Sequence, residues 1–230
     1  MIDLSKLEDR LGLKFKNRDL LEQSLVHRSF INENPGFRLG HNERLEFLGD
    51  AVLELATTEY LYNNFPELPE GEMTSLRAAL VNSNMISQMA QNLRLNDFVL
   101  LSRGEAKDAG RARQYILANA FEAVIGAIYL DQGYEAAKEL IIREVIPELP
   151  RIMEAKLYRD AKSCFQEEAQ ERVGITPTYE VLREWGPDHS KSFVVGVFLE
   201  KELVADGEGV SKQEAQQKAA EEGLKVKGWE

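Results

Sequence analysis

The chain is poor in the residues that most metal and redox sites use. Its 230 residues include a single cysteine, Cys164, which excludes an intrachain disulfide and fits a reducing compartment. The three histidines, His27, His41 and His189, are too scattered to predict a histidine metal site. No H-E-x-x-H, C-x-x-C, Walker or G-x-G-x-x-G pattern occurs. These absences exclude the common zinc, thiol and nucleotide motifs.

The sequence also shows no secretory signal pattern and no long uninterrupted apolar span. Residues 1–12 are charged and amphipathic, without the apolar core of a signal peptide. The longest apolar run, 115–130, contains Asn119 and Glu122, and a membrane span needs roughly 20 residues without such interruptions. Hydrophobic content of 43% and charged content of 29% are typical of globular proteins. We therefore expect a cytoplasmic protein.

Positive charge is scarce: the formal net charge is −11 and the sequence pI is about 5.0. Taken alone, these values argue against nucleic-acid binding, because domains that bind nucleic acid often have a pI above about 9. The total does not locate the charges, however, and an acidic enzyme can carry a local basic surface.

The pattern of apolar residues changes after about residue 159. Helical spacing dominates before that point, including a long helix predicted at 42–62. The remaining chain predicts a helix, three strands and a final helix that begins at Ser211. The expected fold is an all-α domain followed by a small α+β domain of order α-β-β-β-α. The expected boundaries are 1–150 for the helical domain, 151–160 for a linker and 161–228 for the small domain.

Three acids stand on one face of the helix predicted at 42–62. Glu43, Glu46 and Asp50 are spaced i, i+3 and i+7, which places them within about 60° of one another on a helix. The opposite side is expected to face a core and carries Leu45, Leu48, Val52 and Leu55. A solvated acidic stripe is one interpretation. The stripe carries no lysine or arginine, however, and like charges this close favour a bound cation.

The apolar run at 115–130 carries a carboxylate of its own. Glu122 and Asn119 are three residues apart and share a helical face. An ionised carboxylate in such surroundings is costly unless it is paired or bound to metal. Packing this face against the acidic helix would create a site for a hard ion, Mg²⁺ or Mn²⁺, which suits phosphodiester hydrolysis. The alternative is a buried hydrogen bond from Glu122 to Arg44 or Arg77.

Segment 42–50, NERLEFLGD, closely resembles the signature of ribonuclease III, the double-stranded-RNA endonuclease family. Four further blocks resemble that family in the family's order, at 25–30, 70–81, 104–110 and 116–131. The resemblance covers nearly the whole chain. It implies an all-α endonuclease domain that pairs into a homodimer.

The resemblance also implies roles for individual residues. The family's metal-binding glutamate falls on Glu46, its catalytic aspartate on Asp50, and its second catalytic and metal-binding glutamate on Glu122. Asn119 stands where the family usually has aspartate; its amide oxygen can ligate Mg²⁺ but brings no negative charge. Accessory acidic positions fall on Glu43, Glu70 and Glu105.

The C-terminal segment, 161–227, resembles a double-stranded RNA-binding domain. Such domains read duplex RNA by shape, through the minor groove and nearby phosphates. The expected RNA-binding residues are Gln166, His189, Lys191, Lys212 and Lys218. Residues 161–230 contain nine Lys and Arg against fourteen Asp and Glu, so we expect this module alone to bind with modest affinity.

The function expected from these patterns is Mg²⁺-dependent cleavage of double-stranded RNA, with Mn²⁺ as a substitute metal. The resemblance implies 5′-phosphate and 3′-hydroxyl ends, short 3′ overhangs, and a role in rRNA processing and turnover of structured transcripts. The alternative is a double-stranded RNA-binding protein of the same fold with weak or absent catalysis owing to Asn119. A ribosome-associated structural homologue is disfavoured, since a scaffold has no need of the acidic cluster.

Overall fold

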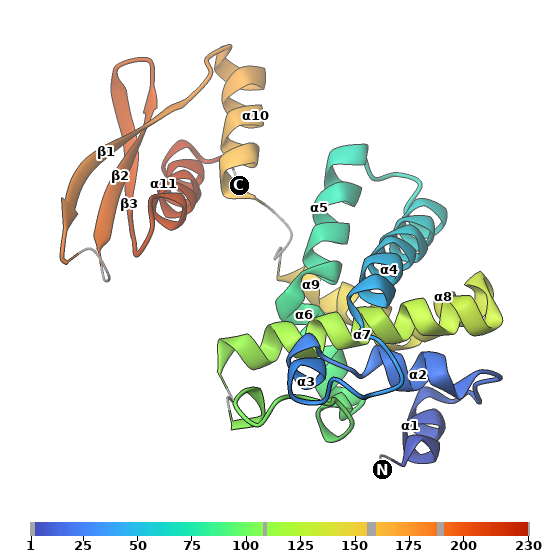
Figure 1. The fold of residues 1–230 in the computed structure, drawn as a ribbon. Helices are drawn as coiled ribbons and strands as arrows, with labels where there is room; N and C mark the ends of the chain where they lie inside the picture. The colour runs from blue at the N-terminus through green and yellow to red at the C-terminus, as the bar shows by residue number, and fades with distance from the viewer. Residues whose placement is uncertain (1–2, 108–109, 156–159, 188–190, 230) are drawn as a thin grey trace. The chain divides into compact units, whose positions relative to one another are not determined.

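Two long helices form the centre of the N-terminal part of the protein. They are α4 (Glu43–Asn64) and α7 (Arg111–Gln132), and they pack against each other in the computed structural model (Figure 1). Helix α7 is buried along most of its length because its apolar residues lie on all sides, as in a helix at the centre of a core. The structure describes residues 3–107, 110–155, 160–187 and 191–229.

Shorter helices surround this pair and complete one hydrophobic core. They are α1 (Leu4–Leu11), α2 (Arg18–Ser24), α3 (Arg28–Glu33), α5 (Glu70–Val81), α6 (Ser83–Asn92), α8 (Tyr134–Glu144) and α9 (Leu149–Glu154), with 3-10 turns η1 (Leu95–Asp97), η2 (Glu105–Lys107) and η3 (Ile146–Glu148). The predicted helix at 42–62 corresponds to α4. The chain separates into two units, Met1–Tyr158 and Arg159–Glu230.

One prediction about the core side of α4 is wrong. Leu45 and Val52 are buried as expected, but Leu55 is 56% exposed. The face that meets the core instead includes Leu53 and Ala56, both fully buried. Sequence spacing does not specify which side of α4 packs against α7. It therefore predicts burial of Leu55, which lies on the side that α7 leaves uncovered.

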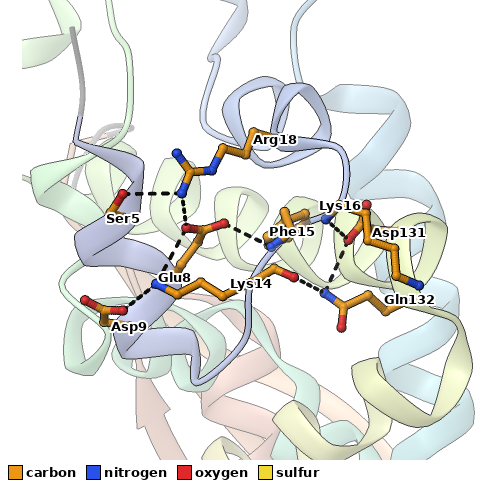
Figure 2. A network of polar contacts seen from close by, with 9 residues as sticks. All are labelled: Ser5, Glu8, Asp9, Lys14, Phe15, Lys16, Arg18, Asp131 and Gln132. Carbon is orange, nitrogen blue, oxygen red and sulfur yellow. Dashed lines mark hydrogen bonds and ion pairs between the residues drawn. The ribbon is translucent and has the colours of Figure 1, made fainter.

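Two acids order the N-terminal segment, and one of them joins it to the central helix (Figure 2). The carboxylate of Glu8 is fully buried; it accepts a hydrogen bond from the Arg18 guanidinium at 2.6 Å and one from a loop backbone N–H at 2.9 Å. Asp131, near the end of α7, accepts the backbone N–H groups of Lys16 and Asn17 at 2.9 and 2.8 Å. These bonds replace water at the polar groups of the loop and anchor the C-terminal end of α7.

The second unit has the order predicted from the sequence. Helix α10 (Ala161–Val173) leads into strands β1 (Thr178–Trp185), β2 (Ser192–Leu199) and β3 (Glu202–Gly209), and α11 (Lys212–Lys227) ends the unit. The strands form an antiparallel sheet of order β1-β2-β3, and α10 and α11 lie on one side of it (Figure 1). A second core around the fully buried Phe165 joins the helices to that face of the sheet.

The first unit extends beyond the boundary that the sequence suggests. The predicted linker begins at residue 151, but α9 continues to Glu154 because Ile152 packs in the core of the helical unit. Residues 156–159 lie outside the described part of the chain. In the part that is described, no helix is both long and apolar enough to cross a membrane.

Candidate active site

Two glycines bring the backbones of α4 and α7 into contact. A Cβ atom on Gly49 would lie 1.7 Å from the carbonyl oxygen of Glu122, and one on Gly126 would lie 2.2 Å from the carbonyl oxygen of Leu45. No larger residue fits at either position without separating the helices. The close approach places side chains one turn away on each helix next to one another.

The side chains of Glu46 and Asn119 meet across this contact. The Asn119 amide donates a hydrogen bond to the Glu46 carboxylate, which favours the ionised form. Partial burial and the negative charges of Glu43 and Asp50 have the larger effect, however, so the pKa of Glu46 is raised. The amide therefore offsets only part of the repulsion that the acids impose on Glu46.

Glu122 lies among the same acids. Its partial burial, followed by the negative charges of Asp50 and Glu46, raises its pKa to about 7. The pKa of Asp50 is also raised, by burial first and then by the charge of Glu54. The structure thus places Glu46, Asp50 and Glu122 within electrostatic range of one another, on two helices far apart in the sequence.

The alternative partners of Glu122 are engaged elsewhere or exposed. The Arg77 guanidinium donates to the hydroxyl of Thr58 at 3.0 Å, and Arg44 is exposed on α4. The charges that act on Glu122 are those of acids, so neither arginine neutralises it. The hypothesis of a buried arginine–Glu122 hydrogen bond has no support in the described part of the chain.

The accessory acids occupy three different places. Glu43 begins α4, where its exposed carboxylate is 3.7 Å from Arg28 and from His41, and its charge acts on Glu46. Glu105 lies in η2, and its charge acts together with that of Glu43 on His27. Of these two acids, only Glu43 is electrostatically coupled to the cluster of Glu46, Asp50 and Glu122.

The third accessory acid, Glu70, begins α5. Its carboxylate accepts a hydrogen bond from the hydroxyl of Thr74 at 2.9 Å, within its own helix. The structure does not join Glu70 to the cluster formed by Glu46, Asp50 and Glu122.

The chemistry of the cluster fits a hard divalent cation. Glu46, Glu122 and Asn119 offer carboxylate and amide oxygens, the ligand atoms that such ions prefer. The pKa values of Glu46 and Glu122 are raised first by burial and then by the neighbouring acids, so a positive charge at this place would be favourable. In the described part of the chain, however, no three acidic, histidine or cysteine side chains stand close enough to form a ready-made metal cage.

Three residues that set this geometry are not among the site residues predicted from the sequence. Gly49 and Gly126 hold the helices together, and Glu54 acts on Asp50. A glycine inside a helix pattern is destabilising unless a close contact requires it, so the two glycines were the available signal. Pairing them across helices requires the fold.

Two of the expected RNA-binding residues near the sheet are described, and one is not. Gln166 is exposed on α10, where its amide is free of the core. Lys191 precedes β2 and forms an ion pair with Glu184 at 3.2 Å. His189 lies outside the described residues. Gln166 is thus available to a ligand, whereas Lys191 must exchange one anionic partner for another.

The two lysines of α11 differ in the same way. Lys212 is exposed in the first turn, with its Nζ 5.7 Å from the centre of the Phe193 ring. Lys218 pairs with Glu214 at 2.8 Å, one turn away. Ser211 caps the helix by accepting the Glu214 N–H, as the S-x-x-E pattern predicts, while the Glu214 carboxylate accepts the N–H of Val210.

Known protein families match both parts of the chain. Residues 17–149 match a family model described as ribonuclease-III-like, and residues 161–227 match one described as a double-stranded RNA-binding motif. A Ribonuclease 3 of Pelotomaculum thermopropionicum is 46% identical over 96% of this chain and 92% of its own length. A Ribonuclease 3 of Nitratiruptor is 43% identical over 98% of this chain and 97% of its own length.

The fold is also found in a solved structure. The nuclease domain of ribonuclease III from Campylobacter jejuni is 42% identical, with a TM-score of 0.58, over 64% of this chain and 99% of that domain. The predicted fold class is confirmed: a helical nuclease domain precedes a small domain with a three-stranded antiparallel sheet. From its motifs, its fold and these matches, the chain belongs to the ribonuclease III family, the double-stranded-RNA endoribonucleases whose signature the acidic helix resembles.

Proposed function

We propose that the protein is a divalent-metal-dependent endoribonuclease that cuts duplex RNA at the acidic cluster between α4 and α7. The observation that carries the proposal is the environment of Glu122. Its carboxyl group is partly buried against Asp50 and Glu46, with a pKa of about 7. Placing acids close together lowers the stability of a fold, whereas it creates a site that attracts a cation.

Mg²⁺ is the metal that this donor set suits best, with Mn²⁺ as a substitute. Glu46, Asn119 and Glu122 would hold the ion, and Asp50 would serve as the second catalytic acid. When bound there, such an ion would supply Lewis acidity and a more acidic water molecule. Without a cation, the Glu122 carboxyl is about half protonated near neutral pH, so it gives up its proton when it becomes a ligand.

The products would be RNA fragments with 5′-phosphate and 3′-hydroxyl ends and short 3′ overhangs. Precursors of ribosomal RNA and other structured transcripts are the substrates that we propose. The helical unit would serve as the endonuclease domain, and the segment 161–228 would serve as the RNA-binding domain. The family match to the double-stranded RNA-binding motif supports duplex RNA as the ligand of this second domain.

A homodimer would expose two copies of the site to the two strands of a duplex. Phe47, Leu55 and Tyr62 are 82%, 56% and 70% exposed, and their spacing on α4 places them within about 80° of one another. Large apolar side chains aligned in this way indicate a binding surface. A second copy of the helical domain is the proposed occupant. The related Campylobacter jejuni structure concerns a region involved in dimer formation of that nuclease domain.

A second candidate function rests on Asn119. An amide at this position hydrogen-bonds Glu46 and adds no charge to attract a cation. The alternative is therefore a duplex-RNA-binding protein with weak or absent catalysis. It requires the same fold and the same C-terminal domain, and differs only in the chemistry of the cluster.

One assay separates the two candidates. Purified protein is incubated with a long RNA duplex and with one of its single strands, in Mg²⁺ and then in EDTA. We expect the duplex to be cleaved in Mg²⁺ but not in EDTA. The fragments should be degraded by an exonuclease that requires a 5′-phosphate. Binding of the duplex without metal-dependent products would instead establish the second candidate.

A further inference from the structure

The sheet of the C-terminal unit has one face that its own helices do not cover. Along β2, Val195, Val197 and Leu199 are buried, and the latter two belong to the core beneath the helices. The alternate residues Gly196 and Phe198 must point to the opposite face, because successive strand side chains alternate. Helices α10 and α11 lie on one side of the sheet only (Figure 1).

Three apolar side chains gather on this open face. A Cβ on Gly196 would lie 2.7 Å from Leu203, 2.9 Å from Phe198 and 3.1 Å from Leu182. All three therefore fold over the same glycine, although they come from three different strands. Leu182 and Leu203 are each 45% exposed, so the cluster is accessible to a partner. Single exposed apolar residues are common, but a contiguous cluster from every strand of a sheet indicates a binding surface.

Acidic side chains flank the apolar cluster. Glu180 on β1 and Asp206 on β3 are both paired with Gly196 in the strand register, so their exposed carboxylates stand on either side of it. Further along β1, Arg183 stacks over the Trp185 ring, 4.7 Å from its centre. The open face thus combines a half-exposed apolar centre with negative charge on two sides.

We infer that this open face docks a basic protein segment, one that presents apolar side chains flanked by lysine or arginine. Charge complementarity selects this occupant: the two carboxylates attract cationic side chains, and the cluster around Gly196 accepts apolar ones. Phosphate groups of RNA are repelled by Glu180 and Asp206. Two of the three proposed RNA-binding lysines, Lys212 and Lys218, lie on α11, on the other side of the sheet (Figure 1). A second copy of the chain would bring like charges together, in a protein of net charge −11.

The test uses the full-length protein and a synthetic amphipathic peptide of leucine and lysine, with a leucine–glutamate peptide of the same pattern as its counterpart. Trp185 lies on the open face, whereas Trp229 packs against Phe165 in the core, 5.3 Å between ring centres. Binding of the basic peptide is expected to change the Trp185 emission. That change should be lost in Trp185→Phe, and the acidic peptide should cause none.

Two double variants locate the binding surface. Leu182→Ser with Leu203→Ser is expected to raise the Kd of the basic peptide at least ~10-fold. Glu180→Gln with Asp206→Asn should weaken binding and reduce its dependence on salt, which tests the charge without altering the apolar cluster. Val226→Ser, an exposed apolar position on α11, is the matched control and should leave the Kd unchanged.

Several results would overturn the inference. They are an unchanged Trp185 emission, equal affinities in both double variants and the control, or equal binding of the acidic peptide. A change in the Trp185 emission on addition of duplex RNA alone, lost in Leu182→Ser with Leu203→Ser, would identify the face as an RNA surface instead. A concentration-dependent doubling of mass that Leu182→Ser with Leu203→Ser abolishes would identify it as a self-association surface.

Discussion

The carbonyl oxygen of Glu122 occupies the space where a side chain on Gly49 would begin, 1.7 Å from the ideal Cβ position. This contact joins the signature helix to the apolar helix at the level of the acidic cluster. It explains how Glu46 and Asp50, on α4, influence a carboxyl group that lies more than seventy residues later in the chain. The acidic chemistry of the site therefore depends on two residues without side chains.

Replacing the second glycine tests this dependence. In Gly126→Ala, the new methyl group would lie 2.2 Å from the carbonyl oxygen of Leu45, so α4 and α7 must move apart. We expect the free energy of unfolding to fall by ~1–3 kcal/mol and duplex cleavage to slow. Urea denaturation and an RNA cleavage assay measure the two effects. Gly71→Ala is the control, since nothing lies within 4 Å of its Cβ position. Wild-type stability and activity in Gly126→Ala would refute the packing argument.

The titration of Glu122 predicts a pH-dependent gain in stability when the acid is removed. Its pKa rises from 4.5 to about 7 on folding, so the folded state binds the proton more tightly. The contribution of Glu122 to the free energy of unfolding is then fully present below pH 4.5 and is lost as the pH rises from 4.5 to about 7. In EDTA, Glu122→Gln should be more stable than wild type by ~1–3 kcal/mol at pH 8 and nearly equal to it at pH 4.

Urea denaturation at the two pH values measures this difference, with Glu139→Gln as the control. Glu139 is exposed on α8, outside the cluster. If the two substitutions change the free energy of unfolding equally at pH 8, burial and repulsion at Glu122 do not destabilise the folded protein.

Asn119→Asp should make the protein more responsive to metal. In EDTA, the added carboxylate replaces an amide that donates to Glu46, so we expect a lower Tm than wild type. In Mg²⁺, the same carboxylate strengthens binding, and a tighter ligand gives a larger rise in Tm. Calorimetry with and without Mg²⁺ measures both shifts, and the cleavage rate should increase. If neither the Mg²⁺-induced shift nor the rate increases, Asn119 does not limit the site.

Phe47→Ser tests the proposed dimer surface. Phe47 is already 82% exposed, so its loss should leave the Tm of the monomer nearly unchanged while it removes apolar contact area between subunits. Sedimentation should show a dimer for wild type and a larger monomer fraction for the variant at equal concentration. Ile142→Ser, at an exposed position on α8, should behave as wild type. A monomeric wild-type protein, or an unaffected variant, is the contrary result.

Helical periodicity accounts for what the sequence could predict of the site. The spacing of Glu43, Glu46 and Asp50 places them on one face of any helix, and the structure keeps them there. The polarity of Glu122 in an apolar segment indicated a partner across the core. Neither pattern specifies which helix faces which, since that depends on packing contacts such as Gly49 with Glu122.

Two further features depended on packing in the same way. The spacing of apolar residues on α4 predicts that Leu55 is buried. The structure leaves Leu55 exposed, because it lies on the side of α4 that does not face the core. Lys191 and Lys218 were assigned to RNA from their positions, but both have acidic partners, Glu184 and Glu214. The i, i+4 spacing of Glu214 and Lys218 predicts their ion pair from the sequence. Lys191 and Glu184 come together only because β1 pairs with β2, which the spacing does not indicate.

The most direct test of the account is the rate of duplex RNA cleavage as Mg²⁺ is titrated, in wild type, Glu122→Gln and Glu139→Gln. We expect saturable, metal-dependent cleavage in wild type and in Glu139→Gln. Glu122→Gln should bind the duplex equally well but cleave it at least ~100-fold more slowly at every Mg²⁺ concentration. If Glu122→Gln cleaves as fast as the wild-type protein, the active site does not lie between α4 and α7. Cleavage by the wild-type protein in EDTA would contradict the proposed metal dependence.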